Sequence, residues 1–542
     1  MTRKKLPIGI QTFREVREDN CYYVDKTAFA LRMVQEGKTY FLSRPRRFGK
    51  SLFLDTLAEL FAGNEPLFRG LHCHDKWDWG TKYPVIRISF GAGITSVRDV
   101  GVLIQRTHEI LKGNAKRLGL TLEEGSIPGQ FSQLILEAEA KFGQRVVVLV
   151  DEYDKPILDH LTRPELARAM RDELRDFYAV IKDMDAHIKF AFLTGVSRFS
   201  KVNIFSGLNN LKDITLNAAY SDICGYTDAD VDTIFAPELE NLDREEIRQW
   251  YNGYKWRGEA VYNPFDLLLL FDCHEFRPFW FETGTPTFLV DMLTERKVYL
   301  PALLKTKSSS ELISAFEVGD ISTEALMFQS GYLTIAGEKI LGDNIMFTLD
   351  YPNREVRGAL TGNILMRWVG NPQKATQSSF ELYEALEIND FERIRGIFFS
   401  LYASIPHDWF RKNNIEQFEG YYASVFYASF AALGLEIIPE DVSNKGKLDM
   451  AIKFNGQVYL FEFKVLARKV KGSPNTALKQ IKEKGYTDKY RALRQPIHLI
   501  GVEFSKKTRN VAGFAVESAD EADNANQKTG NRSVAIHRRF SV

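Results

Sequence analysis

Short apolar runs alternate with longer amphipathic stretches in the N-terminal part of the chain, and this alternation predicts an α/β fold. Four of the runs have the pattern of buried strands, at residues 40–43, 83–90, 145–150 and 189–194. Between and after them, apolar residues recur with helical spacing, which predicts helices at 51–61, 97–117, 129–142 and 164–184. Strands that alternate with helices in this way are typical of α/β domains.

The pattern changes toward the C-terminus. A helix is predicted at 416–433, followed by a strand near Leu435–Ile438 and by two strands at 444–454 and 457–464. Asn455-Gly456 separates the last two strands, and this dipeptide is the strongest short signal for a β-hairpin. These elements predict a second α/β domain.

The middle region, 275–375, combines helical and extended patterns. A helix is expected to start at Gly284, and segments 326–335 and 344–350 have the pattern of two strands around a turn. A helix followed by a two-stranded hairpin is typical of a winged-helix arrangement. The alternative is a helical connector that couples the two ends of the chain.

Length and composition indicate a globular protein of several domains. A chain of 542 residues is too long for a single hydrophobic core. The formal net charge is zero, so any surface for nucleic acid has to be local. The four cysteines are widely scattered, which favours a reducing cytoplasm over a disulfide framework. The start of the chain lacks the apolar run of a signal peptide, and no apolar run is long enough to span a bilayer, so no membrane partner is expected.

The first candidate for chemistry is the segment Phe48-Gly49-Lys50-Ser51, which lies between a predicted strand and a predicted helix. A helix N-terminus presents free N–H groups and a partial positive charge to a phosphate. Gly49 lets the backbone approach, Lys50 can reach the β and γ phosphates, and the Ser51 hydroxyl can bind Mg²⁺. The first glycine of the full phosphate-loop pattern is replaced by Arg44, and a plain strand-to-helix turn is the alternative.

A second part of a nucleotide site follows a hundred residues later. The apolar strand at 145–150 ends in Asp151 and Glu152. In a nucleotide site Asp151 would hold Mg²⁺ through water or Ser51, and Glu152 would polarise the attacking water. A buried strand that happens to end in two acids is the alternative, but the order of the two segments favours a nucleotide site.

Five short segments together resemble the AAA-ATPase-like family, whose members often carry a C-terminal nuclease domain of the PD-(D/E)XK superfamily. They are Leu6–Gln11, Tyr22–Lys26, Arg44–Ser51, Val150–Pro156 and Thr194–Arg198. The resemblance implies a P-loop ATPase domain of the additional-strand class that uses ATP and Mg²⁺. Arg44 in place of glycine is itself typical of this family.

The resemblance also implies roles for two residues at the end of the strand at 189–194. The polar residue at this strand end senses the γ-phosphate in the additional-strand class, which makes Thr194 the candidate. Arg198 could supply positive charge to the transition state, in cis or across a subunit interface of a homo-oligomer. A surface or ion-pair arginine is the alternative for Arg198.

A separate constellation lies on the predicted C-terminal hairpin. Glu462 and Lys464 are two residues apart in one strand and therefore share a face. Asp449 in the neighbouring strand can meet Glu462, and two carboxylates at one point suit Mg²⁺ or Mn²⁺. A metal there would generate hydroxide, while Lys464 orients or deprotonates the water. The alternative is a structural salt bridge.

This Asp…Glu-x-Lys pattern resembles the core of the PD-(D/E)XK nucleases, which have a restriction-endonuclease-like α/β fold. The resemblance adds Glu419 as the acid of the first helix and Gln480 as the glutamine that some members carry. Leu448 stands where the superfamily signature has proline.

Local charge supports contact with nucleic acid. From Lys445 to Arg509 there are 16 Lys and Arg residues against 5 Asp and Glu residues. Such an excess is what contact with a phosphate backbone requires, although a solvated face would show it too. DNA is the expected partner, but lysines alone do not distinguish DNA from RNA.

Together these features predict an ATPase coupled to a metal-dependent nuclease, in four segments: an ATPase domain at 1–274, a connector at 275–380, a nuclease-like domain at 381–515 and a disordered tail at 516–542. A role in defence or mobile-element processing would fit such an architecture. Three alternatives stay open. They are a nucleotide-binding switch with an inactive C-terminal module, an ATPase that acts on a protein partner, and an active nuclease whose ATP site has decayed.

Overall fold

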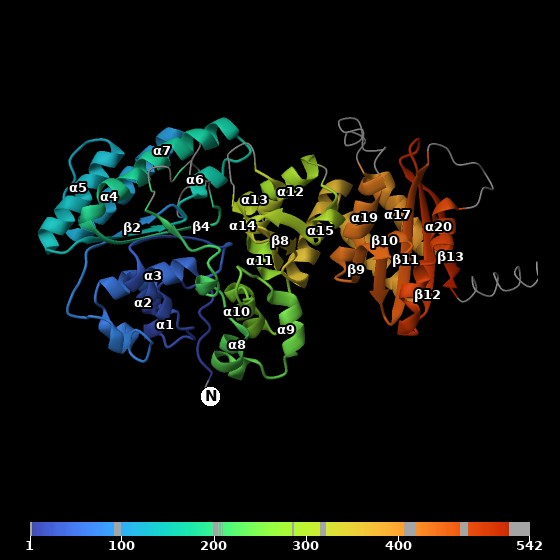
Figure 1. Ribbon diagram of the computed structural model, residues 1–542, viewed down its shortest axis with the longest axis horizontal. Coiled ribbons are helices and arrows are strands. Elements are labelled where there is room, and N and C mark those ends of the chain that lie inside the picture. The colour runs from blue at the N-terminus through green and yellow to red at the C-terminus, as the bar shows by residue number, and fades with distance from the viewer. Residues whose placement is uncertain are drawn as a thin grey trace, which may run out of the picture. The chain divides into compact units, whose positions relative to one another are not determined.

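The structure is a computed structural model. It describes residues 3–91, 99–198, 204, 208, 210–284, 287–296, 298–314, 321–405, 419–466 and 475–519. The chain forms two compact units (Figure 1). Unit 1 comprises 1–288 and 305–356, and unit 2 comprises 289–304 and 357–542. The chain therefore passes from one unit to the other inside the segment that the sequence analysis treats as a connector.

Unit 1 is organised around a parallel sheet with the strand order β2-β3-β4-β1-β5. Its strands are β1 (Thr39–Ser43), β2 (Val85–Ser89), β3 (Val146–Asp151), β4 (Ile188–Gly195) and β5 (Lys212–Asp213). Every residue of β1 and β3 is buried, as expected for strands covered on both faces. Because β4 lies between β1 and β3, the sheet has the order of the additional-strand class, which confirms the predicted fold.

Helices cover both faces of this sheet. Figure 1 shows α4 (Val100–Leu118), α5 (Ile127–Phe142) and α7 (Pro164–Asp183) on one face. The other face carries α1 (Phe13–Glu18), α2 (Thr27–Glu36) and α3 (Lys50–Phe61). Helices α3, α4, α5 and α7 agree with the predicted ones to within a few residues, whereas α1 and α2 were not predicted. A short helix, α6 (Lys155–Leu158), follows β3.

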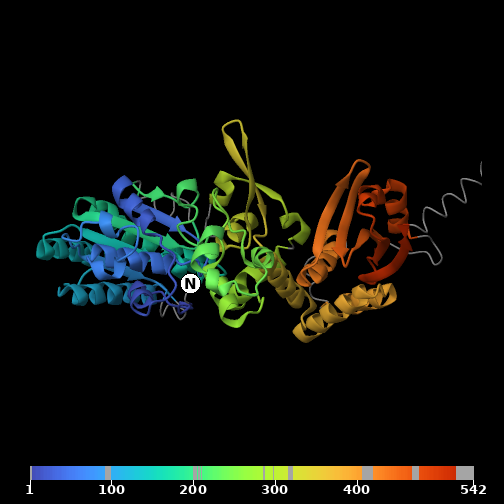
Figure 2. The same cartoon turned by 90° about the horizontal axis from the view of Figure 1, so that it is seen from below.

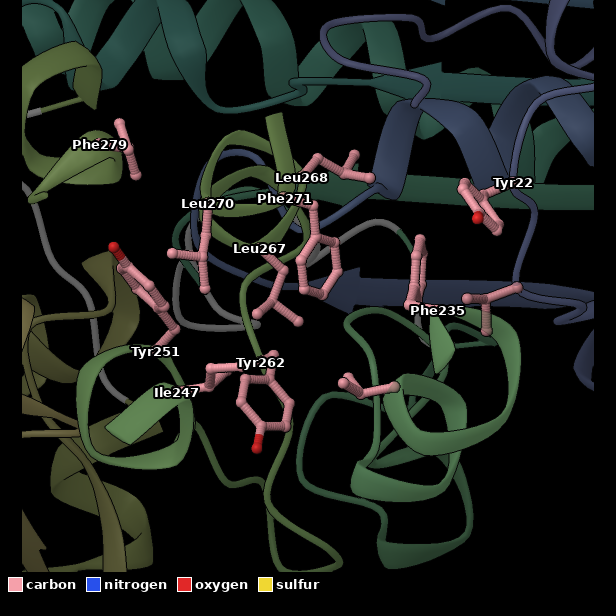
Figure 3. Close-up of a cluster of buried hydrophobic side chains, with 12 residues drawn as sticks. Tyr22, Phe235, Ile247, Tyr251, Tyr262, Leu267, Leu268, Leu270, Phe271 and Phe279 are labelled. Carbon is pink, nitrogen blue, oxygen red and sulfur yellow. The ribbon is translucent and has the colours of Figure 1, made fainter. Parts of the chain in front are cut away.

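A helical subdomain follows β5 in unit 1. It contains α8 (Asp228–Ile234), α9 (Arg244–Tyr251), α10 (Pro264–Cys273) and α11 (Phe279–Gly284). Figure 3 shows Leu267 and Phe271 of α10 gathered with Ile247 and Tyr251 of α9 in a buried cluster. Tyr22 and Val24, from the N-terminal segment, belong to the same cluster. The start of the chain is therefore part of this core.

The middle region contains a hairpin near the predicted one, but the helices before it are α13 (Ser310–Ser314) and α14 (Thr323–Ser330), whereas the helix predicted from Gly284 corresponds to α12 (Thr287–Glu295). β6 (Thr306–Ser309), α13, α14, β7 (Thr334–Leu341) and β8 (Asn344–Asp350) follow one another, and the antiparallel sheet has the order β6-β8-β7. Figure 2 shows the β7–β8 hairpin projecting from this small sheet. This is the connectivity of a winged helix.

One predicted strand in this region is wrong. Residues 326–330 belong to helix α14, and the strand begins only at Thr334. Ser322 caps the helix by accepting a hydrogen bond from Ala325 N, and Gly331, with φ 91°, ends it. Residues 325–329 of this helix are all buried, so the run lacks the alternation of apolar and polar positions that separates helix from strand.

Unit 2 is built on a mixed sheet with the order β13-β12-β11-β10-β9. The strands are β9 (Glu436–Ser443), β10 (Gly446–Phe454), β11 (Gln457–Leu466), β12 (Ile497–Ser505) and β13 (Asn510–Ser518). The β10–β11 hairpin turns at Asn455 and Gly456, with φ of 47° and 69°, as a type I′ turn requires. The predicted hairpin is confirmed.

The helices of unit 2 cover this sheet with aromatic side chains. They include α15 (Arg354–Val369), which starts in unit 1, together with α16 (Pro372–Glu387), α17 (Phe391–Ser404), α19 (Glu419–Ala432) and α20 (Thr476–Lys484). Phe426 of α19 stacks on Phe398 of α17 with ring centroids 3.6 Å apart and also contacts Phe463 of β11. Helix α12 (Thr287–Glu295) and the short helix η6 (Leu300–Leu303) precede them in the chain.

The predicted tail begins inside β13, which extends to Ser518, and from residue 520 on it lies outside the described residues. No helix in the part of the chain that the structure describes is both long enough and apolar enough to cross a membrane.

Candidate functional site

The phosphate loop lies between β1 and α3, as the sequence predicts. Gly49 has φ 89°, a left-handed conformation that suits glycine, and α3 begins at Lys50. The Lys50 ammonium is buried and donates hydrogen bonds to the carbonyls of Arg44 and Pro45, at 2.9 and 2.8 Å. Burial lowers the pKa of Lys50. The loop thus holds a desolvated cation next to a helix N-terminus.

Asp151 of β3 meets Ser51 of α3 at the ends of the strands. The Ser51 hydroxyl donates to Asp151 Oδ2 at 2.6 Å, and the hydroxyl of Thr194, at the end of β4, donates to Asp151 Oδ1 at 2.8 Å. Three predicted site residues from separate segments therefore converge. Since Thr194 is wholly buried and bonded to Asp151, it is placed to orient this carboxylate.

Glu152 is the next residue after Asp151. Its φ of 51° is unusual for a glutamate and turns the chain out of β3. Burial, followed by the charge of Asp151, raises the pKa of Glu152. Glu152, Lys50 and Ser51 all line one cavity of about 440 Å³. A carboxyl with a raised pKa beside a hydroxyl and an ammonium can accept a proton from water.

Arg44 belongs to the loop that is expected to bind nucleotide, but its side chain points away from the cavity. Its guanidinium does not line the cavity but is fully buried, where it donates to the carbonyls of Ser43, Thr215 and Tyr220 at 2.8 to 3.0 Å. It also lies 4.1 Å from the ring centroid of Trp256. The Arg44 side chain therefore anchors the loop to the following subdomain, and only its backbone carbonyl contacts Lys50.

Phe48 and Arg198 are also held by neighbouring side chains. Phe48 is wholly buried, packs edge-on against Tyr254 and Trp256, and is among the residues that line the cavity. The Arg198 guanidinium forms an ion pair with Asp213 and does not line the cavity. An ion-pair arginine is the alternative that the sequence left open.

The second site lies on the β10–β11 hairpin of unit 2. Asp449 Oδ2 accepts a hydrogen bond from Phe463 N at 2.7 Å. Glu462 is 1% exposed, and its Oε1 accepts from Lys464 at 3.3 Å and from the Gln480 amide of α20. Its Oε2 is buried and has no hydrogen-bond partner among the described residues. An orphaned carboxylate oxygen in such a place is costly unless it is used.

The ionisable groups around this hairpin change one another's pKa values. Burial raises the pKa of Asp449 to about 6, and burial together with the charge of Asp449 raises the pKa of Glu462 to about 7. Lys464 lies 3.5 Å from Glu419 of α19 and 3.3 Å from Glu462. Although burial lowers the pKa of Lys464, these carboxylates bring it above the usual value. Lys464 is therefore charged at neutral pH.

The donor set fits a hard divalent cation that keeps several waters. Asp449 and Glu462 offer two carboxylates, and the unpartnered Oε2 of Glu462 points to a missing positive group. Mg²⁺ is commonly held by one or two carboxylates with water in its other positions. No cluster of three or more His, Cys, Asp or Glu side chains suited to a metal occurs within the described ranges.

Comparison with known proteins identifies a family for each of the two domains. The family model described as "Predicted AAA-ATPase" matches residues 7–205, and that of the PD-(D/E)XK nuclease superfamily matches residues 417–514. The chain is 60% identical over 519 residues to the "Uncharacterized protein in vnfD 5'region" of Azotobacter chroococcum mcd 1, covering 96% of this chain and 100% of that protein. The chain belongs to the AAA-ATPase-like family. Its C-terminal domain belongs to the PD-(D/E)XK nuclease superfamily.

Sequence reasoning missed a tyrosine that supports the nuclease-like site of this AAA-ATPase-like protein. Tyr486, just after α20, donates to the carbonyl of Lys447 on β10 at 2.8 Å and hydrogen-bonds with the side chain of Gln480. Because Gln480 in turn bonds Glu462, Tyr486 links the two strands that carry the acids. No local pattern marks this tyrosine.

Several lysines of the basic segment 445–509 are neutralised by acids from other parts of the chain. These acids precede or follow residues 445–509 in the sequence and form ion pairs with lysines inside this range. The pairs are Lys447 with Glu440, Lys453 with Glu436, Lys482 with Glu517 and Lys489 with Asp441. Contact with nucleic acid therefore depends on fewer free cations than the count of residues indicates.

Proposed function

We propose that this AAA-ATPase-like protein binds and hydrolyses ATP in unit 1 and cleaves nucleic acid with a metal-dependent site in unit 2. The observation that carries the nuclease activity is the buried, unpartnered Oε2 of Glu462 beside Asp449. Although Lys464 pairs with Oε1 of Glu462, the buried Oε2 is left without a partner in the part of the chain that the structure describes, and such an oxygen is retained most readily where a cation binds. DNA is the proposed substrate, and the cytoplasm the proposed location.

Each residue of the hairpin site has a definite task in phosphodiester hydrolysis. Asp449 and Glu462 would hold Mg²⁺ or Mn²⁺, which supplies a hydroxide at neutral pH and neutralises charge on the phosphate. The Phe463 amide and the Gln480 amide orient the two carboxylates. Since Lys464 is charged, its role is to orient the attacking water and stabilise the phosphate charge rather than to take a proton.

We assign separate roles to the residues of the ATP site in the same way. Ser51 and Asp151 would hold Mg²⁺, and Thr194 keeps Asp151 in place. Glu152 is the proposed base because it lines the cavity and burial raises its pKa. Lys50 has to exchange its two loop carbonyls for phosphate oxygens. Because the loop carbonyls compete with phosphate oxygens for Lys50, a second candidate function is a nucleotide-binding switch that hydrolyses ATP slowly. In that case the C-terminal domain would not cleave nucleic acid.

The test uses the full chain with Mg²⁺ or Mn²⁺ and supercoiled, linear or single-stranded DNA, with and without ATP. We expect cutting that is lost in Asp449→Ala and altered in Lys50→Ala. Glu483→Ala, an exposed acid on α20, is the matched control and should cut normally. Nucleotide binding without cutting under any condition would replace the nuclease by the switch.

A further inference from the structure

The cavity at the phosphate loop is larger than a triphosphate needs, and part of its lining has no assigned role. Besides the loop, Pro7, Ile10 and Gln11 line it from the N-terminal segment, and Tyr226, Phe265 and Leu268 line it from the helical subdomain. The N-terminal residues belong to the segment Leu6–Gln11, which has no part in the chemistry described above. All of these residues belong to unit 1.

The N-terminal segment is fixed at both ends. Tyr22 N donates to the carbonyl of Lys5 at 3.0 Å, and Phe13 N donates to Asp55 Oδ2 at 2.6 Å. Asp55 lies in α3, the helix that begins at the phosphate loop, and its other oxygen pairs with Arg87 at 2.5 Å. The backbone is therefore anchored on both sides of the segment Leu6–Gln11, and one of the anchors is on the helix that begins at the phosphate loop.

The part of the lining that comes from the helical subdomain, which we call the apolar wall, is held in place by a buried cluster. Phe265 and Leu268 are in the first turns of α10, and Leu268 belongs to the buried cluster of Figure 3. Tyr226 and Phe265 pack against the same cluster. Arg47 of the phosphate loop lies 4.0 Å from the ring centroid of Phe265. A flat, apolar group attached to the phosphates would be placed against this wall.

Most polar side chains on the N-terminal side of the cavity already have partners. The Tyr22 hydroxyl donates to Glu238 at 2.7 Å, the Tyr23 hydroxyl lies 3.4 Å from that of Thr56, and Lys26 pairs with Asp230 at 3.2 Å. The Gln11 side chain, in contrast, is exposed and makes no hydrogen bond with the described residues. Its amide is available to a ligand.

We propose that Gln11 recognises the adenine base of the nucleotide, against the apolar wall formed by Tyr226, Phe265 and Leu268. A glutamine amide offers one donor and one acceptor side by side, which match N7 and the N6 amino group of adenine. The same edge of guanine presents two acceptors. Gln11 thus selects ATP over GTP. The inference rests on the proposed nucleotide site.

The test compares binding of fluorescent ATP, GTP and 7-deaza-ATP to the full chain with Mg²⁺. Wild type should prefer ATP to GTP, and 7-deaza-ATP, which lacks the N7 acceptor, should bind about tenfold more weakly than ATP. Gln11→Ala should lose a similar factor for ATP and should no longer distinguish ATP from 7-deaza-ATP. Gln105→Ala, an exposed glutamine on α4, is the matched control and should keep the wild-type preference.

Two results would overturn the inference, and they differ. If Gln11→Ala keeps the wild-type ratios among the three nucleotides while nucleotide still binds, base recognition lies elsewhere and the proposed ATP site stands. If no nucleotide binds the wild-type chain, the proposed function itself fails together with the inference. The comparison of ATP with 7-deaza-ATP on wild type needs no mutation, so a variant that does not fold leaves the test valid.

Discussion

Metal binding at the hairpin site should depend steeply on pH. A carboxylate must be deprotonated to hold a cation, so protons compete with the metal for Asp449 and Glu462. The pKa of Asp449 is raised to about 6 and that of Glu462 to about 7, both above the ordinary range of carboxyls. Metal affinity should therefore rise with pH through these two values and level off near pH 8.

The size of the effect follows from the two pKa values. At pH 6 about half of Asp449 and about a tenth of Glu462 would be ionised, so roughly one molecule in twenty has both charges. At pH 8 roughly nine molecules in ten have both. The apparent affinity should accordingly be about twentyfold weaker at pH 6 than at pH 8.

Titration calorimetry with Mn²⁺ at pH 6, 7 and 8, at constant ionic strength, measures this dependence on the full chain. Gln480→Ala removes a hydrogen bond that stabilises the ionised form of Glu462, so the pKa of Glu462 should rise. The Mn²⁺ affinity of this variant should therefore increase with pH over a higher pH range than in the wild type. Asp449→Asn should bind weakly at every pH. A wild-type affinity that stays constant from pH 6 to 8 would refute the reasoning, because both carboxyls would then be ionised throughout.

Three further predictions concern residues that hold the sites in place. Ser51→Ala should weaken ATP binding about tenfold when Mg²⁺ is present and change it little when Mg²⁺ is absent, because the variant loses the hydroxyl proposed to bind the metal. Nucleotide titration with and without Mg²⁺ measures both affinities. Arg44→Ala should lower the free energy of unfolding of unit 1 by about 3 kcal/mol, because it leaves several buried carbonyls without a donor. Arg46→Ala changes a half-exposed side chain and is the control, so thermal unfolding of this variant should be nearly unchanged. Tyr486→Phe should weaken Mn²⁺ binding about tenfold and shift its pH profile, whereas Tyr490→Phe, which loses an equivalent buried bond to β9, should do neither.

Features that depend on local pattern could be predicted from the sequence. The turn at Asn455 and Gly456 needs only two residues with positive φ, and the alternation in β11 sets which side chains share a face. The phosphate loop is equally local, since a glycine, a helix start and a preceding strand suffice to define it. The approach of Asp151 to Ser51 followed from the order of the strands.

Features that depend on distant partners could not be predicted. The guanidinium of Arg44 finds its acceptors about 170 residues further along, and nothing near Arg44 indicates that it turns away from the phosphates. The strand expected at 326–330 became a helix because burial on all sides removes the periodic signal. The lysines after Lys445 looked unpaired because their acids lie outside the segment that was counted.

The turn at Asn455 and Gly456 also has a consequence for folding. Asp449 and Glu462 are joined by a hairpin, whose formation closes only a short loop, whereas Ser51 and Asp151 meet only after a hundred residues have been arranged between them. Hairpins form within microseconds, and contacts between distant segments form later. We therefore expect the two carboxylates of unit 2 to be brought together early, while the hairpin is still hydrated and their mutual repulsion is screened by water. The desolvation that raises their pKa values would arise only when α19 and α20 pack onto the finished sheet.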